Sequence, residues 1–155
     1  GSNAGLDITK SPGRKWYSVS RDGGITWESI KDMRYDTGEQ FYSPATIHQL
    51  IRSSKTGKLY WIGNINNVPS NDNGPRYPLQ IVEVDEKGPS LIKDTVTVID
   101  DRDTSKDSEF LQLSNFALLE DREHGHMEIY LTRLGENGGG QDIWTANSYK
   151  YTLTF

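Results

Sequence analysis

The stretch SRDGGITW, residues 20–27, joins two segments that have the composition of short β-strands. The carboxylate of Asp22 and the hydroxyl of Ser20 can accept hydrogen bonds from backbone N–H groups of their own turn. The two glycines that follow supply the positive φ angles that a tight turn requires. Trp27 is expected to fold back over the hairpin and to bury its ring. The stretch therefore predicts a hairpin turn that its own side chains close, with a structural role and no catalytic one.

The remainder of the chain predicts an all-β protein. Aromatic and β-branched residues alternate with polar ones at a period of two, which is typical of strands. Glycine-rich and asparagine-rich turn sequences separate the alternating segments. Residues 110–120 also fit a helical period, but their neighbours favour a strand. The predicted strands are residues 15–20, 25–30, 43–51, 58–65, 79–84, 90–99, 110–120, 126–134, 142–146 and 150–155.

Composition limits the classes of protein to which the chain can belong. Its 155 residues suit one domain or part of a larger one. The net charge of -5 argues against a nucleic-acid partner, and no apolar run approaches the roughly 20 residues of a membrane span. Because the chain has no cysteine, disulfides and thiolate metal sites are excluded. Residues 1–4, Gly-Ser-Asn-Ala, are typical of a vector-derived leader.

An internal repeat organises the predicted strands. The stretch FYSPATIHQLIRSSKTGKLYWIGN (41–64) is echoed by EFLQLSNFALLEDREHGHMEIYLTR (109–133), and SRDGGITW is echoed in degraded form by VDEKGPSL (84–91). A repeat of four strands on this scale is typical of the blades of a β-propeller.

The first of these stretches resembles the Asp-box, Ser-x-Asp-x-Gly-x-Thr-Trp, of sialidases and related BNR-repeat proteins. The residues that match the box are Ser20, Asp22, Gly24, Thr26 and Trp27. The segments SPATIHQL, GKLYWIGNIN and RYPLQIVEV also resemble sialidase-like proteins of Bacteroides-type glycan degraders.

The resemblance implies an all-β fold that is part of a six-bladed sialidase-like β-propeller. Residues 5–155 would be its C-terminal portion, about two and a half blades of four-stranded antiparallel sheets. The expected parts are an outer half-blade at 15–30 that carries the Asp-box, a full blade at 43–99 and a last blade at 110–155. In this family the boxes lie on the face opposite the active site.

Two residues match positions that carry chemistry in the family. A tyrosine that opens the blade after an Asp-box is the sialidase nucleophile, and Tyr42 in FYSPA stands at that place. A phenol titrates at about 10 and needs a neighbouring base to become nucleophilic, so a structural tyrosine at a strand start is the alternative. Arg76 precedes Val84, the start of the second box, by the same offset as a family arginine, but it belongs to the blade that Tyr42 opens and not to the one before.

The functional face of such a propeller is built from the connections 39–42, 64–77, 103–109 and 133–141. The planar fork of Arg76 can hold a carboxylate or a sugar hydroxyl, or form a surface ion pair with an acid such as Asp72. Asparagines of this face can contact sugar hydroxyls, although asparagine also populates long loops. The further candidate substrate contacts are Asn64, Asn66, Tyr77 and Arg133.

Two other polar stretches are given no function. The stretch HGH, His124 to His126, falls in a tight turn with no third ligand expected nearby, so no metal site is predicted. Residues 100–109, DDRDTSKDSE, are expected to be a solvated connection whose acids could also face a ligand.

The function implied by the resemblance is glycoside hydrolysis with a tyrosine nucleophile, a departure from the two-carboxylate scheme. The chain contains no match for the catalytic acid or for the glutamate that activates the tyrosine, so this portion alone is expected to be inactive. The alternative is a non-catalytic glycan-binding or interaction propeller. The expected partner is a glycan or a sialoside-like small molecule, with no cofactor. A homo-oligomer formed through the open blade flank and a secreted or periplasmic location are further expectations.

Overall fold

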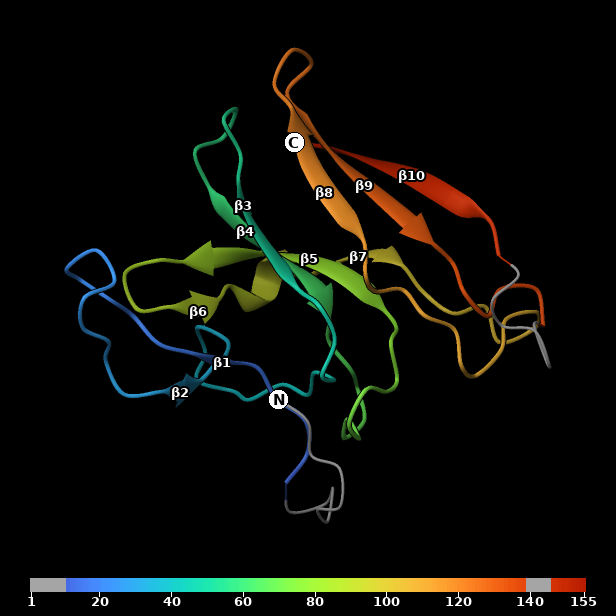
Figure 1. The fold of residues 1–155 in the computed structure, drawn as a ribbon, viewed down its shortest axis with the longest axis horizontal. Helices are drawn as coiled ribbons and strands as arrows, with labels where there is room; N and C mark the ends of the chain where they lie inside the picture. Colours follow the sequence, from blue (N-terminus) through green and yellow to red (C-terminus); the bar gives the residue numbers. More distant parts are fainter. Residues whose placement is uncertain (1–10, 139–145) are drawn as a thin grey trace.

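The computed structural model describes residues 11–138 and 146–155, which form several antiparallel β-sheets, none of them closed into a barrel (Figure 1). The all-β prediction is confirmed, since the described residues contain no α-helix and only one short 3₁₀ helix, η1. No helix in this part of the chain is long and apolar enough to cross a membrane. The elements are β1 Trp16–Tyr17, β2 Lys31–Asp32, β3 Gln49–Arg52, β4 Leu59–Asn64, β5 Leu79–Asp85, β6 Ser90–Leu91, η1 Lys93–Thr95, β7 Thr97–Asp100, β8 Ala117–Asp121, β9 His126–Thr132 and β10 Ser148–Thr154.

The central sheet has the meander order β3–β4–β5, and both β6 and β7 pair with the outer edge of β5. β6 pairs with the end of β5 and β7 with its beginning. The predicted strand 90–99 is therefore divided into two short strands by η1. Side chains along β4 and β5 point alternately to the two faces of the sheet, as the strand period requires.

Both faces of the central sheet are covered by apolar side chains. On one face, Ile62 and Leu79 pack with Met127 and Ile129 of β9. The other face is covered by residues from the chain before β3, of which Phe41 packs with Trp61, Val82 and Leu91. The central sheet is thus sandwiched between the N-terminal segment and the sheet of β8, β9 and β10.

The third sheet has the order β8–β9–β10 and leaves its outer face exposed. Leu119 and Tyr130 lie on this outer face and are exposed. The predicted strands 126–134 and 150–155 correspond to β9 and β10. The predicted strand 142–146 lies almost entirely outside the described residues.

Other predicted strands also differ from the structure, and the strand predicted at 15–20 is reduced to Trp16–Tyr17. Residues 25–30 form no strand, because Lys31 and Asp32 pair with β1 and the chain before them is held by side-chain hydrogen bonds of the turn. The strands predicted at 43–51 and 110–120 begin only at Gln49 and at Ala117. The backbone before these strands bonds to more distant partners. For example, the carbonyl of Pro44 accepts a hydrogen bond from the buried ammonium of Lys15.

The turn of residues 20–27 is closed by its own side chains, as predicted. The carboxylate of Asp22 accepts hydrogen bonds from the backbone N–H of Thr26 at 2.9 Å and from its hydroxyl at 2.6 Å. The hydroxyl of Ser20 accepts the N–H of Gly24 at 2.7 Å and donates to Asp22 at 2.8 Å. Gly24 has a φ of 91°, which explains why a glycine stands there.

The predicted burial of Trp27 is wrong. Its indole N–H donates to the carbonyl of Gly24 at 3.2 Å, so the ring does fold back over the turn. The side chain is nevertheless 64% exposed, because this turn projects from the N-terminal segment and nothing among the described residues packs on its outer side. In Figure 1 the turn lies beyond the end of β5, whereas the connection 65–78 lies at the beginning of β5.

The degraded second box makes a different contact. Glu86 stands where the first box has Asp22, but it forms a bidentate ion pair with Arg52. The two guanidinium nitrogens lie 2.9 and 2.6 Å from the two carboxylate oxygens. The turn is capped instead by Asp85, which accepts the N–H of Lys87 at 3.0 Å. The shift by one residue follows from the longer side chain of glutamate, which reaches past its own turn to Arg52 at the end of β3, on the far side of β4.

We expect Asp22→Ala to loosen the turn, because the N–H and the hydroxyl of Thr26 then lose their acceptor. Hydrogen bonds from Thr26 and Ser20 lower the pKa of Asp22 to about 2 from an ordinary value of 3.8. Its contribution to stability is therefore complete above pH 3.8 and is lost as the pH falls toward 2. An NMR titration should show the low pKa, and hydrogen exchange at the amide of Thr26 should accelerate in the variant.

The matched control is Glu86→Ala, which should leave the exchange at Thr26 unchanged. A carboxyl of Asp22 that titrates at 3.8, or a Thr26 amide that exchanges equally fast with and without Asp22, would contradict the capping role.

Candidate functional site

The described parts of the four connections predicted to form one face meet at one edge of the sheets, and residues 139–141 of the last connection lie outside the described residues. Tyr42 bridges to Asn66, and Arg76 bridges to Gln112, which in turn bridges to Leu134. Isolated β-bridges thus join connections that are far apart in the sequence. They lie where strands of the central and third sheets begin or end (Figure 1).

Asn64 and Asn66 hold this edge together from inside. The amide nitrogen of Asn64 lies 3.0–3.1 Å from the carbonyls of Arg76, Pro78 and Leu113, and its side chain is completely buried. The amide of Asn66 donates to the carbonyl of Tyr77 at 2.7 Å. The structure therefore gives both amides internal partners, and the expected contacts with sugar hydroxyls are not possible without breaking them.

Tyr42 stands beside a cation and not beside a base. The guanidinium carbon of Arg14 lies 5.4 Å from the centre of its ring. Within residues 11–138 and 146–155, no side chain hydrogen-bonds its hydroxyl. A cation over the ring face is a stabilising contact, but it cannot remove the phenolic proton. The site thus contains the matched tyrosine without the group that would activate it.

Tyr77 lines a cavity of about 230 Å³ together with Asn67, Pro75 and Arg102. Its hydroxyl donates to the carbonyl of Glu109 at 3.3 Å, and the guanidinium carbon of Arg102 lies 5.7 Å from the ring centre. The cavity combines an aromatic ring, an arginine and an exposed amide, which are groups that bind small polar molecules.

Arg76 opens into a second cavity of about 240 Å³, which is also lined by Asn73, Glu109, Phe110 and Gln112. Its Nε donates to the carbonyl of Asn73 at 3.1 Å and its Nη1 to the side chain of Gln112 at 2.9 Å. No partner of its Nη2 is found in the described part of the chain. The two bonds fix the guanidinium plane, and the remaining N–H groups can donate to an anion in the cavity. The alternative ion pair with Asp72 is not among the contacts of Arg76.

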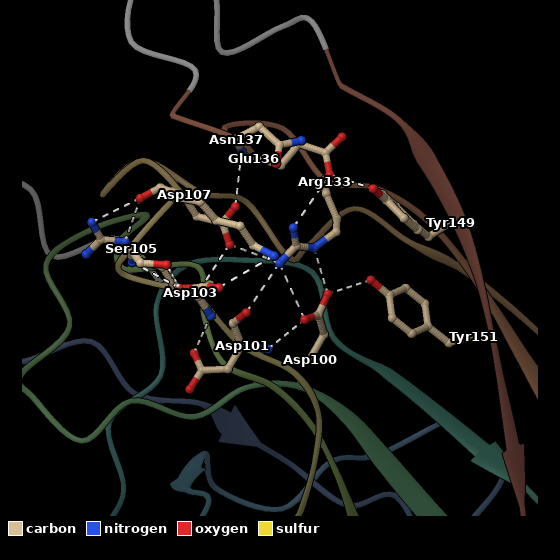
Figure 2. A network of polar contacts seen from close by, with 12 residues as sticks. Asp100, Asp101, Asp103, Ser105, Asp107, Arg133, Glu136, Asn137, Tyr149 and Tyr151 are labelled. Carbon is tan, nitrogen blue, oxygen red and sulfur yellow. Dashed lines mark hydrogen bonds and ion pairs between the residues drawn. The ribbon is translucent and has the colours of Figure 1, made fainter.

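Arg133 is held by three carboxylates (Figure 2). Its Nε lies 2.8 Å from Asp100, its Nη2 3.2 Å from Asp107 and its Nη1 3.5 Å from Glu136. Only 11% of the side chain is exposed. All three nitrogens of the guanidinium are engaged, so the predicted substrate contact is replaced by a role that joins β7, the 101–107 connection and the third sheet.

Two tyrosines of β10 complete this network. Tyr149 donates to Glu136 at 2.7 Å and Tyr151 donates to Asp100 at 2.5 Å (Figure 2). Burial and the hydrogen bond to Asp100 raise the pKa of Tyr151, which favours the protonated form that donates to this carboxylate. The network therefore connects β10 to the edge formed by the connections 39–42, 64–77, 103–109 and 133–138, which we call the loop edge.

Most of the connection 100–109 is exposed, as predicted, but Asp107 is an exception. Its side chain has no exposed surface. Burial raises the pKa of its carboxyl, but N–H groups of Asp103 and Asn137 and the guanidinium of Arg133 hold it below the ordinary value. Sequence reasoning missed this residue. The one available signal was the run of acids in the connection, DDRDTSKDSE.

The histidine-containing turn also differs from its prediction. Asp121 and Glu128 lie near His126, and one ligand atom of each residue lies within 4.8 Å of the others. This is the group among the described residues that could hold a metal ion, and it lies at the opposite end of β9 from Arg133.

Comparisons with protein-family models, with curated proteins and with solved structures find no match to this chain. The likeness to sialidases therefore stays a prediction that rests on its motif residues.

Replacing Arg133 by methionine should destabilise the fold by about 3–5 kcal/mol, because three carboxylates then lose their common cation. Without that cation the folded-state pKa values of Asp107 and Glu136 rise. The deficit relative to the parent protein should therefore shrink as the pH falls and these groups take up protons. Urea unfolding between pH 7 and pH 4 measures both effects.

Arg122→Met is the matched control, since the side chain of Arg122 is 83% exposed and its loss should change stability little. Equal costs for the two substitutions would show that the network around Arg133 does not support the fold.

Proposed function

We propose that this chain is the C-terminal portion of a sialidase-like β-propeller whose loop edge binds acidic glycans and does not hydrolyse them by itself. The observation that carries this proposal is the guanidinium of Arg76, which is fixed by two internal hydrogen bonds and keeps donors directed to a cavity. A carboxylate is the complementary group for such a fork, and sialic acids are sugars that carry one.

The surroundings of Arg76 suit a sugar ring. Phe110 lines the same cavity and is 62% exposed, so it offers an apolar face for stacking. Gln112 and Glu109 add polar atoms that can hydrogen-bond hydroxyls. The neighbouring cavity of Tyr77 and Arg102 extends the surface along the same connection, so it could receive a second sugar unit.

The chemistry of Tyr42 favours binding over hydrolysis for this portion of the protein. Glycoside cleavage requires a general acid and an activated nucleophile that converge on one bond. The phenol of Tyr42 has no base among its contacts in the described residues, and Arg14 occupies the face of its ring. A complete sialidase would supply the acid and the activating glutamate from blades outside this chain.

The arrangement of the sheets supports a partial propeller. The central sheet is a meander with a divided outer strand, and it packs between two neighbours as a blade does. On this view residues 15–30 belong to an outer half-blade, 43–99 to a full blade and 110–155 to the last one. A secreted or periplasmic location is expected from the resemblance to sialidases.

The binding proposal is tested with sialyllactose as the probe and lactose as the neutral control, by saturation-transfer NMR and calorimetry. The parent protein should bind only the acidic sugar. Arg76→Ala should weaken binding by about tenfold or more, as expected for the loss of a charge-assisted hydrogen bond of roughly 1.5–3 kcal/mol. Arg122→Ala, which removes an exposed arginine elsewhere, should bind like the parent protein.

Two outcomes would contradict the proposal. Equal binding of lactose and sialyllactose would remove the role of the carboxylate. Turnover of a fluorogenic sialoside above that of a Tyr42→Phe variant would show that the chain is catalytic by itself.

A partial propeller should also associate through its open flanks. Ile25 and Trp27 are 82% and 64% exposed at one end, and Leu119 is 44% exposed on the outer face of the third sheet. Apolar flanks of this kind favour packing against another copy. Light scattering at tens of micromolar should therefore detect a dimer or larger assembly, and the double variant Ile25→Lys, Leu119→Lys should be monomeric. A parent protein that is monomeric at this concentration would defeat the idea.

A further inference from the structure

We propose that the tip of the hairpin formed by β8 and β9 binds a divalent transition-metal ion, with Asp121, His126 and Glu128 as ligands. The inference is independent of the proposed glycan site. The hairpin tip lies at the beginning of β9, whereas Gln112 of the Arg76 cavity bridges to Leu134, which follows the end of β9. In Figure 1 the tip projects away from the loop edge, on the side where the turn between β3 and β4 also projects.

The backbone of the hairpin places the three side chains together. Asp121 and His126 are directly paired across the two strands, so their side chains lie on the same face. Glu128 stands two residues after His126 and therefore points to that face as well. Gly125 has a φ of 68°, which allows the short turn between the strands. The ligand set is thus built on paired strands and does not depend on a long loop.

The carboxylate of Asp121 is oriented by the turn. Its Oδ1 accepts the N–H groups of Glu123 at 3.0 Å and His124 at 3.2 Å. These bonds hold Oδ2 toward the imidazole of His126, whose Nε2 is 3.5 Å away. One oxygen therefore closes the turn while the other is directed at the proposed metal position.

The distances between the ligand atoms fit one small ion. The Nε2 of His126 lies 3.1 Å from Glu128 Oε1 and 3.5 Å from Asp121 Oδ2. Zinc bonds of roughly 2.0–2.2 Å in a tetrahedron separate neighbouring ligand atoms by about 3.4 Å. Two of the three separations therefore already stand near the spacing that a shared Zn²⁺ would impose, and the third, between Asp121 and Glu128, lies within 4.8 Å.

His124 can supply a fourth ligand. Its Nδ1 lies 2.7 Å from Asp121 Oδ2, and its ring stacks on that of His126 with centroids 5.8 Å apart. The side chain is 65% exposed, so it can turn without disturbing a core. Two imidazoles and two carboxylates suit zinc and its neighbours among the transition metals, whereas Ca²⁺ and Mg²⁺ prefer oxygen ligands alone.

Lys150 is the group that competes with the ion. Its ammonium forms an ion pair with Oε1 of Glu128, the oxygen that faces His126, while Tyr130 donates to Oε2 at 2.6 Å. The lysine comes from β10 and is 48% exposed, so its flexible side chain can move into solvent when a metal binds. Tyr130 would continue to orient the carboxylate, as outer partners of metal ligands do.

The test is calorimetric titration of the metal-free protein with zinc chloride, with calcium chloride as the comparison. One equivalent of zinc should bind and calcium should not. His126→Gln and Asp121→Asn should each weaken zinc binding by at least about tenfold, the lower end of what the loss of an indirect metal contact costs. The chain has three histidines, so His48→Gln is the matched control and should bind zinc like the parent protein.

A second variant separates metal binding from a folding defect. Lys150→Gln removes the competing ammonium, so it should bind zinc more tightly than the parent protein. NMR signals of His124 and His126, and not of His48, should shift on addition of zinc. The proposal is overturned if the parent protein shows no saturable zinc binding, if His48→Gln loses binding as His126→Gln does, or if Lys150→Gln binds zinc more weakly.

Discussion

Trp61 and Ile62 are neighbours in β4, yet both are almost completely buried because they point to opposite faces of the central sheet. A strand can be apolar on both faces only if a layer covers each of them. The N-terminal segment covers one face and the third sheet covers the other. Even the next residue serves this arrangement, since a Cβ at Gly63 would lie 2.7 Å from the ring of Trp61. The burial of both faces of β4 therefore fixes the order of the three layers: the N-terminal segment, the central sheet and the third sheet.

The double burial also explains the chemistry of the loop edge. Chain that leaves a fully buried strand carries polar backbone groups into the interior, and these need partners. Asn64 at the end of β4 provides them for two other connections. Arg133, which follows β9, forms ion pairs with three carboxylates of the same edge. These polar groups of the loop edge therefore have internal hydrogen-bond or ion-pair partners. The N–H groups of Arg76 that are not engaged by Asn73 and Gln112 are available to a ligand.

Three turns at the ends of strands opposite the loop edge are each capped by an aspartate, but the second carboxylate oxygen has different partners in the first and third turns. Asp22, Asp85 and Asp121 each accept a backbone N–H group of their own turn. In the first turn both carboxylate oxygens of Asp22 are used by Thr26. In the third turn the second oxygen of Asp121 faces an imidazole instead, since His126 is its cross-strand partner. The same capping residue can therefore close a turn or contribute to a metal site, according to the side chain across the hairpin.

The sequence by itself determined the all-β class, most strand positions and the closed turn at 20–27, because these follow from local periodicity and from hydrogen bonds within a few residues. Only the tertiary structure decided the burial of Trp27, the internal role of Arg133 and the grouping of Asp121 with Glu128. Each of these depends on which side chains approach from another strand or connection. Local patterns carry the period of a strand and the chemistry of a turn, but the partner that satisfies a charge is chosen by packing between segments that are distant in the sequence.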